Sequence, residues 1–215
     1  MTLLECLIGI ALCTLLLNPL LQTSASLTSK QDEYEKSLVL NLEAERALEL
    51  IGRAIRMAGY QHLNSHVKDK IYKDKVRKAA DLPIELHKKI GFQQSDALIV
   101  RHELSDGIDF DCIGNALTSH RTKRNLALQG FLVDRQSNLP KGVKVNGGSL
   151  ICQSLDRQGR LQNTTLMNGV NSLVIDELNP HVGYPQRAFR VELNMTDGAN
   201  IHKAFERIFT TRNLP

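Results

Sequence analysis

The chain is poor in aromatic residues: it has no tryptophan, and its four tyrosines and six phenylalanines make up only 5% of 215 residues. Glycine and proline are also few, 14 and 6 residues, which excludes a collagen-like chain or one built mainly of linkers. The net charge of +4 is too small to indicate nucleic-acid binding by itself. Apolar residues at 42% and charged residues at 23% are ordinary for a folded domain with a hydrophobic core.

Motifs that would indicate catalysis are missing as well. The sequence contains no G-x-S-x-G, HExxH, P-loop or G-x-G-x-x-G pattern. His62 and His66 are spaced as a metal pair on a helix, but no third ligand is near them in the sequence. Asp106, Asp109 and Asp111 lack the acidic twelfth ligand of an EF-hand loop, and turn chemistry explains them better than calcium. We therefore predict no metal, no cofactor and no enzymatic activity.

Charge is nearly absent from the first 22 residues, where Glu5 is the single charged side chain and no basic residue precedes Lys30. The apolar run from Met1 to Leu21 has the length of about 20 residues that a spanning helix needs. A secretory signal peptide would begin with a basic region, so the pattern favours a retained membrane helix. A carboxylate near the centre of a bilayer costs about 2.5–3.5 kcal/mol. Glu5 therefore calls for a partner such as a neighbouring subunit's α-amino group, or else it extends to the membrane interface.

A helical pattern continues beyond this run. Apolar residues recur at helical spacing on one face, at Tyr34, Leu38, Leu42, Leu48, Ile51, Ile55 and Ala58. Gly59 is a plausible stop, so one helix is predicted from about Thr2 to Ala58. Asn18-Pro19 predicts either a kink or a short extended stretch. Glu49 and Arg53 are predicted to form an i,i+4 ion pair.

The remainder of the chain is predicted to be a separate head. Residues 61–90 are polar and indicate a short surface helix or a loop. Strands are predicted at 97–102, 127–133, 149–155, 161–167, 172–178, 189–195 and 204–210, with turn residues between them. The predicted fold is α+β, a long N-terminal helix packed on an antiparallel β-sheet head. Its parts are a transmembrane half (1–22), an amphipathic half (23–59) and the head (60–215).

A basic cluster lies at the start of the head. It consists of Lys68, Lys70, Lys73, Lys75, Arg77 and Lys78, with Asp69 and Asp74 as the only acids among them. A run of charges is usually solvated surface, which is the simpler interpretation. The alternative is contact with DNA, although Tyr72 alone is weak evidence for base stacking.

The N-terminal residues MTLLECLIGIALCTLLL resemble those of a mature type IV pilin or pseudopilin. In that family a glycine cleavage site is followed by Phe-Thr-Leu-Ile-Glu. Thr2, Leu3, Leu4 and Glu5 follow the motif, and Met1 stands where Phe is usual. The strings RAIRMAGY (53–60), DCIGN (111–115), LIC (150–152), LMNGVNSLV (166–174) and FTTRN (209–213) are similar to those of PilW-like minor pilins.

This resemblance implies a function in filament assembly. A prepilin peptidase would cut before Met1 and methylate the new amine, and Glu5 would neutralise a neighbour's N-terminus. The partners would be other minor pilins and the major pilin, packed through their helical stems. The protein would move from the inner membrane to the extracellular pilus, at its tip, with the head periplasmic or extracellular. It would serve pilus functions such as adhesion, twitching motility and competence. The alternatives are a minor pseudopilin of a type II secretion system, a competence tip subunit that contacts DNA, and an anchored periplasmic enzyme.

The four cysteines fall into two pairs. Cys6 and Cys13 are about 10 Å apart along one helix, which is too far for a disulfide between them. Cys112 and Cys152 lie in the head, which the implied topology places in an oxidising compartment. We predict a disulfide between these two, with free buried thiols as the alternative.

Overall fold

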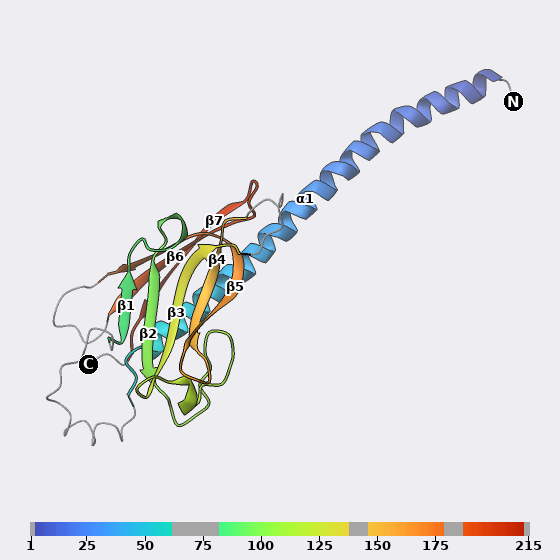
Figure 1. Ribbon diagram of the computed structural model, residues 1–215. Coiled ribbons are helices and arrows are strands. Elements are labelled where there is room, and N and C mark those ends of the chain that lie inside the picture. The colour runs from blue at the N-terminus through green and yellow to red at the C-terminus, as the bar shows by residue number, and fades with distance from the viewer. Residues whose placement is uncertain (1–2, 62–81, 138–145, 179–186, 213–215) are drawn as a thin grey trace, which may run out of the picture. The chain divides into compact units, whose positions relative to one another are not determined.

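The computed structural model describes residues 3–61, 82–137, 146–178 and 187–212 (Figure 1). By internal contacts the chain divides into two units, Met1–Asn41 and Leu42–Pro215. The division falls inside the long helix, whereas the predicted head begins at residue 60. Met1, the histidine pair His62/His66 and the basic cluster all lie outside the described residues.

The first element, α1, is a single helix from Leu3 to Met57 with Pro19 inside it. The extended stretch that Asn18-Pro19 allowed is therefore absent. Proline removes one backbone hydrogen bond, and the leucines on both sides of it favour helix strongly enough for the helix to continue. Gly59 has a φ of +70°, and its N–H donates to the carbonyl of Arg101 at 3.0 Å. The predicted stop at Gly59 is thus confirmed, with the helix ending two residues before it.

Within the second unit, the final turns of α1 lie along one face of the sheet (Figure 1). The helix face in the core is fully buried and consists mainly of small and β-branched residues: Ala44, Ala47, Leu48, Ile51, Ala54, Ile55 and Ala58. The predicted apolar stripe is correct from Leu48 onward. Its earlier members Tyr34, Leu38 and Leu42 are exposed instead. Leu42 lies nine residues before Ile51, and at about 100° per residue this places it on the opposite side of the helix, whereas the neighbouring Leu40 and Ala44 are buried. The predicted stripe therefore changes face in this part of the helix.

The head contains one seven-stranded sheet in which every neighbouring pair is antiparallel and the order follows the sequence. The strands are β1 (Ile84–His87), β2 (Ala97–Glu103), β3 (Leu126–Arg135), β4 (Gly148–Leu155), β5 (Leu161–Glu177), β6 (Ala188–Thr196) and β7 (His202–Thr210). Two short 3₁₀ turns, η2 (Phe92–Gln94) and η3 (Ser119–Arg121), lie between strands. The predicted α+β fold, a long helix packed on an antiparallel sheet, is confirmed.

Strand β5 is one long strand where the sequence predicts two. Its first part pairs with β4 as far as Val170, and its second part pairs with β6 from Val170 onward. Register shifts occur on both sides of this point, and Gly169 has a φ of +79°. A bulge of this kind bends a strand and increases its twist, so one strand serves two halves of a curled sheet.

The core fills the space between this sheet and the helix. Its largest fully buried residues on the strands are Leu98, Phe131, Leu150, Leu173, Ile175, Phe189 and Leu193. Along β6, burial alternates as expected for a strand with one face on a core. The head therefore has a core of its own, which lies between the buried face of the helix and the sheet.

Candidate functional site

The first half of α1 exposes apolar side chains all the way round. Among the described residues, α1 is the one helix that is long and apolar enough to cross a membrane. Its exposed leucines and isoleucines are Leu3, Leu4, Leu7, Ile8, Ile10, Leu12, Leu15, Leu16, Leu17, Leu20 and Leu21. An apolar surface of this extent is not stable in water and indicates a lipid or protein environment. The segment is consistent with a membrane anchor.

Glu5 lies in the first turn of this apolar helix, and it is exposed. A carboxylate at that position is favoured by the partial positive charge of the helix N-terminus. The structure thus places Glu5 at the end of the apolar segment and not in its middle. The predicted partner of Glu5 is the N-terminal amine of a neighbouring subunit, and Met1, which would carry that amine, lies outside the described residues.

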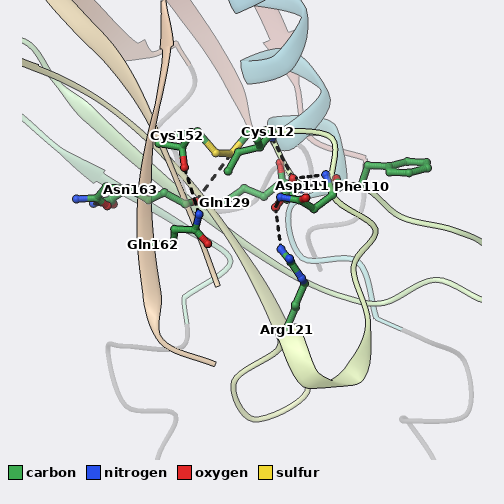
Figure 2. Close-up of a disulfide and its surroundings, with 12 residues drawn as sticks. Phe110, Asp111, Cys112, Arg121, Gln129, Cys152, Gln162 and Asn163 are labelled. Carbon is green, nitrogen blue, oxygen red and sulfur yellow. Dashed lines mark hydrogen bonds and ion pairs between the residues drawn. A yellow bond between two sulfur atoms is a disulfide. The ribbon is translucent and has the colours of Figure 1, made fainter. Parts of the chain in front are cut away.

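The disulfide predicted between the two head cysteines is present (Figure 2). Cys152 lies within β4 and Cys112 in the connection from β2 to β3, with their Cα atoms 6.1 Å apart. Both are buried. The bond closes a loop of 40 residues, which in the chain-entropy model contributes about 3–4 kcal/mol of stability. Cys6 and Cys13 are free and exposed on α1.

Beside the disulfide, the buried carboxylate of Asp111 organises the connection between β2 and β3 (Figure 2). It accepts hydrogen bonds from the backbone N–H groups of Ile113 at 3.0 Å and Asn115 at 2.8 Å. Arg121 lies 3.4 Å from its other oxygen. These donors occupy the carboxylate, so Asp111 is used for loop structure. Within the described part, no group of three His, Cys, Asp or Glu residues is placed to hold a metal ion.

Several shifted pKa values of the head belong to ion pairs that join its strands. The Nζ of Lys88 lies 3.0 Å from the buried carboxylate of Asp96 and 2.9 Å from the exposed carboxylate of Asp176. Burial alone would lower the pKa of Lys88, but hydrogen bonds to Asp176 and Asp96 outweigh it and raise that pKa. Hydrogen bonds from Lys88 and Arg190 lower the pKa of Asp176. These shifts are explained by structural pairing and do not indicate a catalytic group.

A pocket that no sequence motif predicts opens where α1 ends. It is lined by Arg53, Arg56, Met57, Tyr60, Ser105, Asp109 and Arg212 and holds about 510 Å³. The predicted pair of Glu49 with Arg53 is wrong, because Glu49 binds Arg56 instead, at 2.7 Å. The repeated arginines before Gly59 are the one sequence signal for this pocket. Its other walls come from segments that only the fold brings together.

Comparison with known protein families, with characterised proteins and with solved structures finds no match for this chain. The fold and the sites above are therefore the basis for any functional assignment.

Proposed function

We propose that this chain is a PilW-like minor pilin of a type IV pilus system. It is held in the inner membrane by α1, primes filament assembly and belongs to a complex of minor pilins at the pilus tip. One observation carries the proposal: an apolar helix with Glu5 in its first turn continues without interruption into the helical segment that completes the core of the head.

The exposed apolar surface of α1 is longer than a bilayer requires. A span of about 20 residues from Leu3 covers the hydrocarbon core and ends near Gln22. Exposed apolar residues continue beyond it, at Leu27, Tyr34, Leu38, Val39 and Leu42. Lipid does not cover this second stretch, so it calls for other proteins. Packing among helical stems supplies such a surface, whereas a simple membrane anchor has no use for it.

In this proposal Glu5 pairs with the N-terminal amine of a neighbouring subunit. A charge in a low-dielectric setting is costly when it is alone and is strongly attracted to an opposite charge at the same depth. The pair would fix the axial register of one stem against the next. Met1 would be the terminus that the prepilin peptidase exposes and methylates. Other minor pilins and the major pilin would provide the neighbouring stems.

The test compares Glu5→Gln with a matched control, Glu33→Gln, in the cells that produce the protein. Glu33 is an exposed carboxylate of the same helix that makes no ion pair with any residue of the described ranges. We expect Glu5→Gln to leave the protein processed and present in the membrane but to lower the number of surface filaments about tenfold or more, because a charged pair is lost. Normal filament numbers in Glu5→Gln would refute the role of Glu5.

Co-purification in detergent, followed by mass spectrometry of the companions and of the N-terminus, completes the test. Other minor pilins together with an N-methylated Met1 are the expected result. Secretion-system components as companions would identify a minor pseudopilin instead. An unmodified terminus without any pilin-like companion would overturn the proposal and leave an anchored domain.

A further inference from the structure

The pocket at the end of α1 draws its lining from three parts of the chain, all of them in the second unit. Arg53, Arg56, Met57 and Tyr60 belong to the last turns of the helix and the residues just after it. Ser105 and Asp109 follow β2, and Arg212 follows β7. Its volume of about 510 Å³ lies within the range of about 300–1,000 Å³ that is typical of small-molecule sites.

Positive charge dominates this pocket, with three guanidinium groups against the single carboxylate of Asp109. Arg56 is engaged with Glu49 and lies over the ring of Phe209. Arg53 and Arg212 are exposed, and neither makes an ion pair with any residue in the described part of the chain. The helix dipole favours basic residues in the last turn of α1. The helix dipole does not explain the presence of Arg212, which comes from the opposite end of the sequence.

We propose that this pocket binds an acidic sugar, a uronate-type ligand that carries hydroxyl groups beside a carboxylate. Arg53 and Arg212 hold the carboxylate, since a guanidinium group offers paired donors that match its geometry. The ring of Tyr60 and the thioether of Met57 offer apolar surface to the C–H face of the sugar ring.

Asp109 is the residue that selects a hydroxylated ligand over a bare anion. Its Oδ2 accepts a hydrogen bond from the backbone N–H of Ser105 at 2.8 Å. Its Oδ1 accepts none from the residues that the structure describes. A carboxylate inside an anion site repels any anion, but it accepts hydrogen bonds from sugar hydroxyls, which a simple carboxylate such as acetate lacks. The hydroxyl of Ser105 can donate to or accept from the same ligand.

The experiment uses the full chain in detergent at low salt and measures ligand binding by saturation-transfer NMR. The probes are D-glucuronate, D-glucose as its neutral counterpart, and acetate as a carboxylate without hydroxyl groups. We expect D-glucuronate to bind at least about tenfold more tightly than either of the other two, because only this probe offers both the charge and the hydroxyl groups. Equal binding of D-glucose would overturn the role of the arginines, and equal binding of acetate would overturn the role of Asp109.

Variants assign the binding to this pocket. Arg53→Gln and Arg212→Gln should each weaken D-glucuronate binding about tenfold. Arg157→Gln is the matched control, because Arg157 is an exposed arginine in the turn between β4 and β5 and does not line the pocket. Arg53→Lys keeps the positive charge but not the paired donors. Its affinity for D-glucuronate should therefore lie between those of the parent protein and of Arg53→Gln. Unchanged binding in both glutamine variants, with the fold intact by circular dichroism, would overturn the proposal. This inference does not depend on the proposed pilus function.

Discussion

At the scale of single residues, Gly52 shows how closely α1 approaches the sheet. It is buried in the helix interior, and a β-carbon added there would overlap the ring of Phe209 on β7. Glycine inside a helix costs about 1 kcal/mol relative to alanine. Its presence is therefore explained by the contact with Phe209 and not by helix formation.

Gly52→Ala should lower the free energy of unfolding by about 1–3 kcal/mol, because the cost of overpacking exceeds the gain in helix propensity. Chemical denaturation of the detergent-solubilised chain, followed by circular dichroism, measures the change. Gly107→Ala is the control, since a β-carbon there meets only the Ser105 hydroxyl oxygen, at 3.7 Å. A Gly52→Ala protein as stable as the parent would show that the helix and β7 are not packed this tightly.

For single residues, the sequence predicts a structural role only where the residue type has few possible roles. The two cysteines of the head predict a disulfide, which the structure contains, whereas the assembly role of Glu5 stays a prediction. Gly52 has no such signal, because a helix pattern shows which residues share a face but not the distance to what they face. The pairing of Glu49 with Arg56 instead of Arg53 has the same origin, because side-chain direction near a helix end depends on the surrounding tertiary contacts.

At the scale of elements, ion pairs reinforce the join between neighbouring strands. Arg187, next to the start of β6, binds Glu177 at the end of β5 through two hydrogen bonds of 2.6 and 2.8 Å. The same guanidinium lies over the ring of Phe189, 5.1 Å from its centroid. Both partners are only partly exposed, so the pair is better protected from solvent than a typical surface salt bridge.

This pair should make stability depend on pH in the acidic range. Hydrogen bonds from Arg187 lower the pKa of Glu177 in the folded state, against the opposing effect of burial. A lowered pKa contributes stability at pH values above the unfolded pKa, and that contribution is lost as the pH falls through the folded pKa. At neutral pH, Glu177→Gln should therefore melt at a lower temperature than the parent. The two melting temperatures should converge in acid, below the ordinary pKa of a glutamic acid.

Thermal melts of both proteins between about pH 7 and pH 3 test this expectation. Carboxylates common to the two proteins cancel in the difference, and Glu33→Gln controls for the loss of one exposed charge. A difference in melting temperature that stays constant down to the acid end would contradict the expected linkage.

Element boundaries were predictable where period-two alternation and turn residues coincide, as in β2, β3, β4, β6 and β7. The sequence predicts two strands, 161–167 and 172–178, where β5 is continuous, because it does not show that Gly169 forms a bulge at which the strand changes partners. Strand β1 was missed because it has four residues in a polar stretch and is defined by its pairing with β2. Pairing of one short strand with another leaves no recognisable pattern in the local sequence.

At the scale of the whole molecule, the fold class follows from the order of its elements. One long helix before a series of short strands predicts an α+β head, and the structure agrees. The pocket at the end of α1 was not predictable, because its walls are about 50 to 150 residues apart in the sequence. Convergence of distant segments is a property of the fold, so a single sequence shows the helix that contributes Arg53 and not the site it helps to form.

The cysteines divide between the apolar helix and the head, which allows one experiment to test the membrane placement of the chain. Cys6 and Cys13 are free on the apolar part of α1, and Cys112 and Cys152 are joined in the head. In intact membranes, a membrane-impermeant maleimide should label none of the four, since lipid shields the first pair and the disulfide protects the second. After denaturation in detergent it should label Cys6 and Cys13 alone, and after reduction all four, as counted by the mass added to the intact chain. Labelling of Cys13 in intact membranes would show that this helix does not lie in lipid, whereas labelling of Cys112 before reduction would show that the head does not carry its disulfide. Because Cys13 lies near the middle of the proposed span and Cys6 near its end, the order in which they become reactive as lipid is replaced by detergent also reports how deeply the N-terminus with Glu5 is inserted.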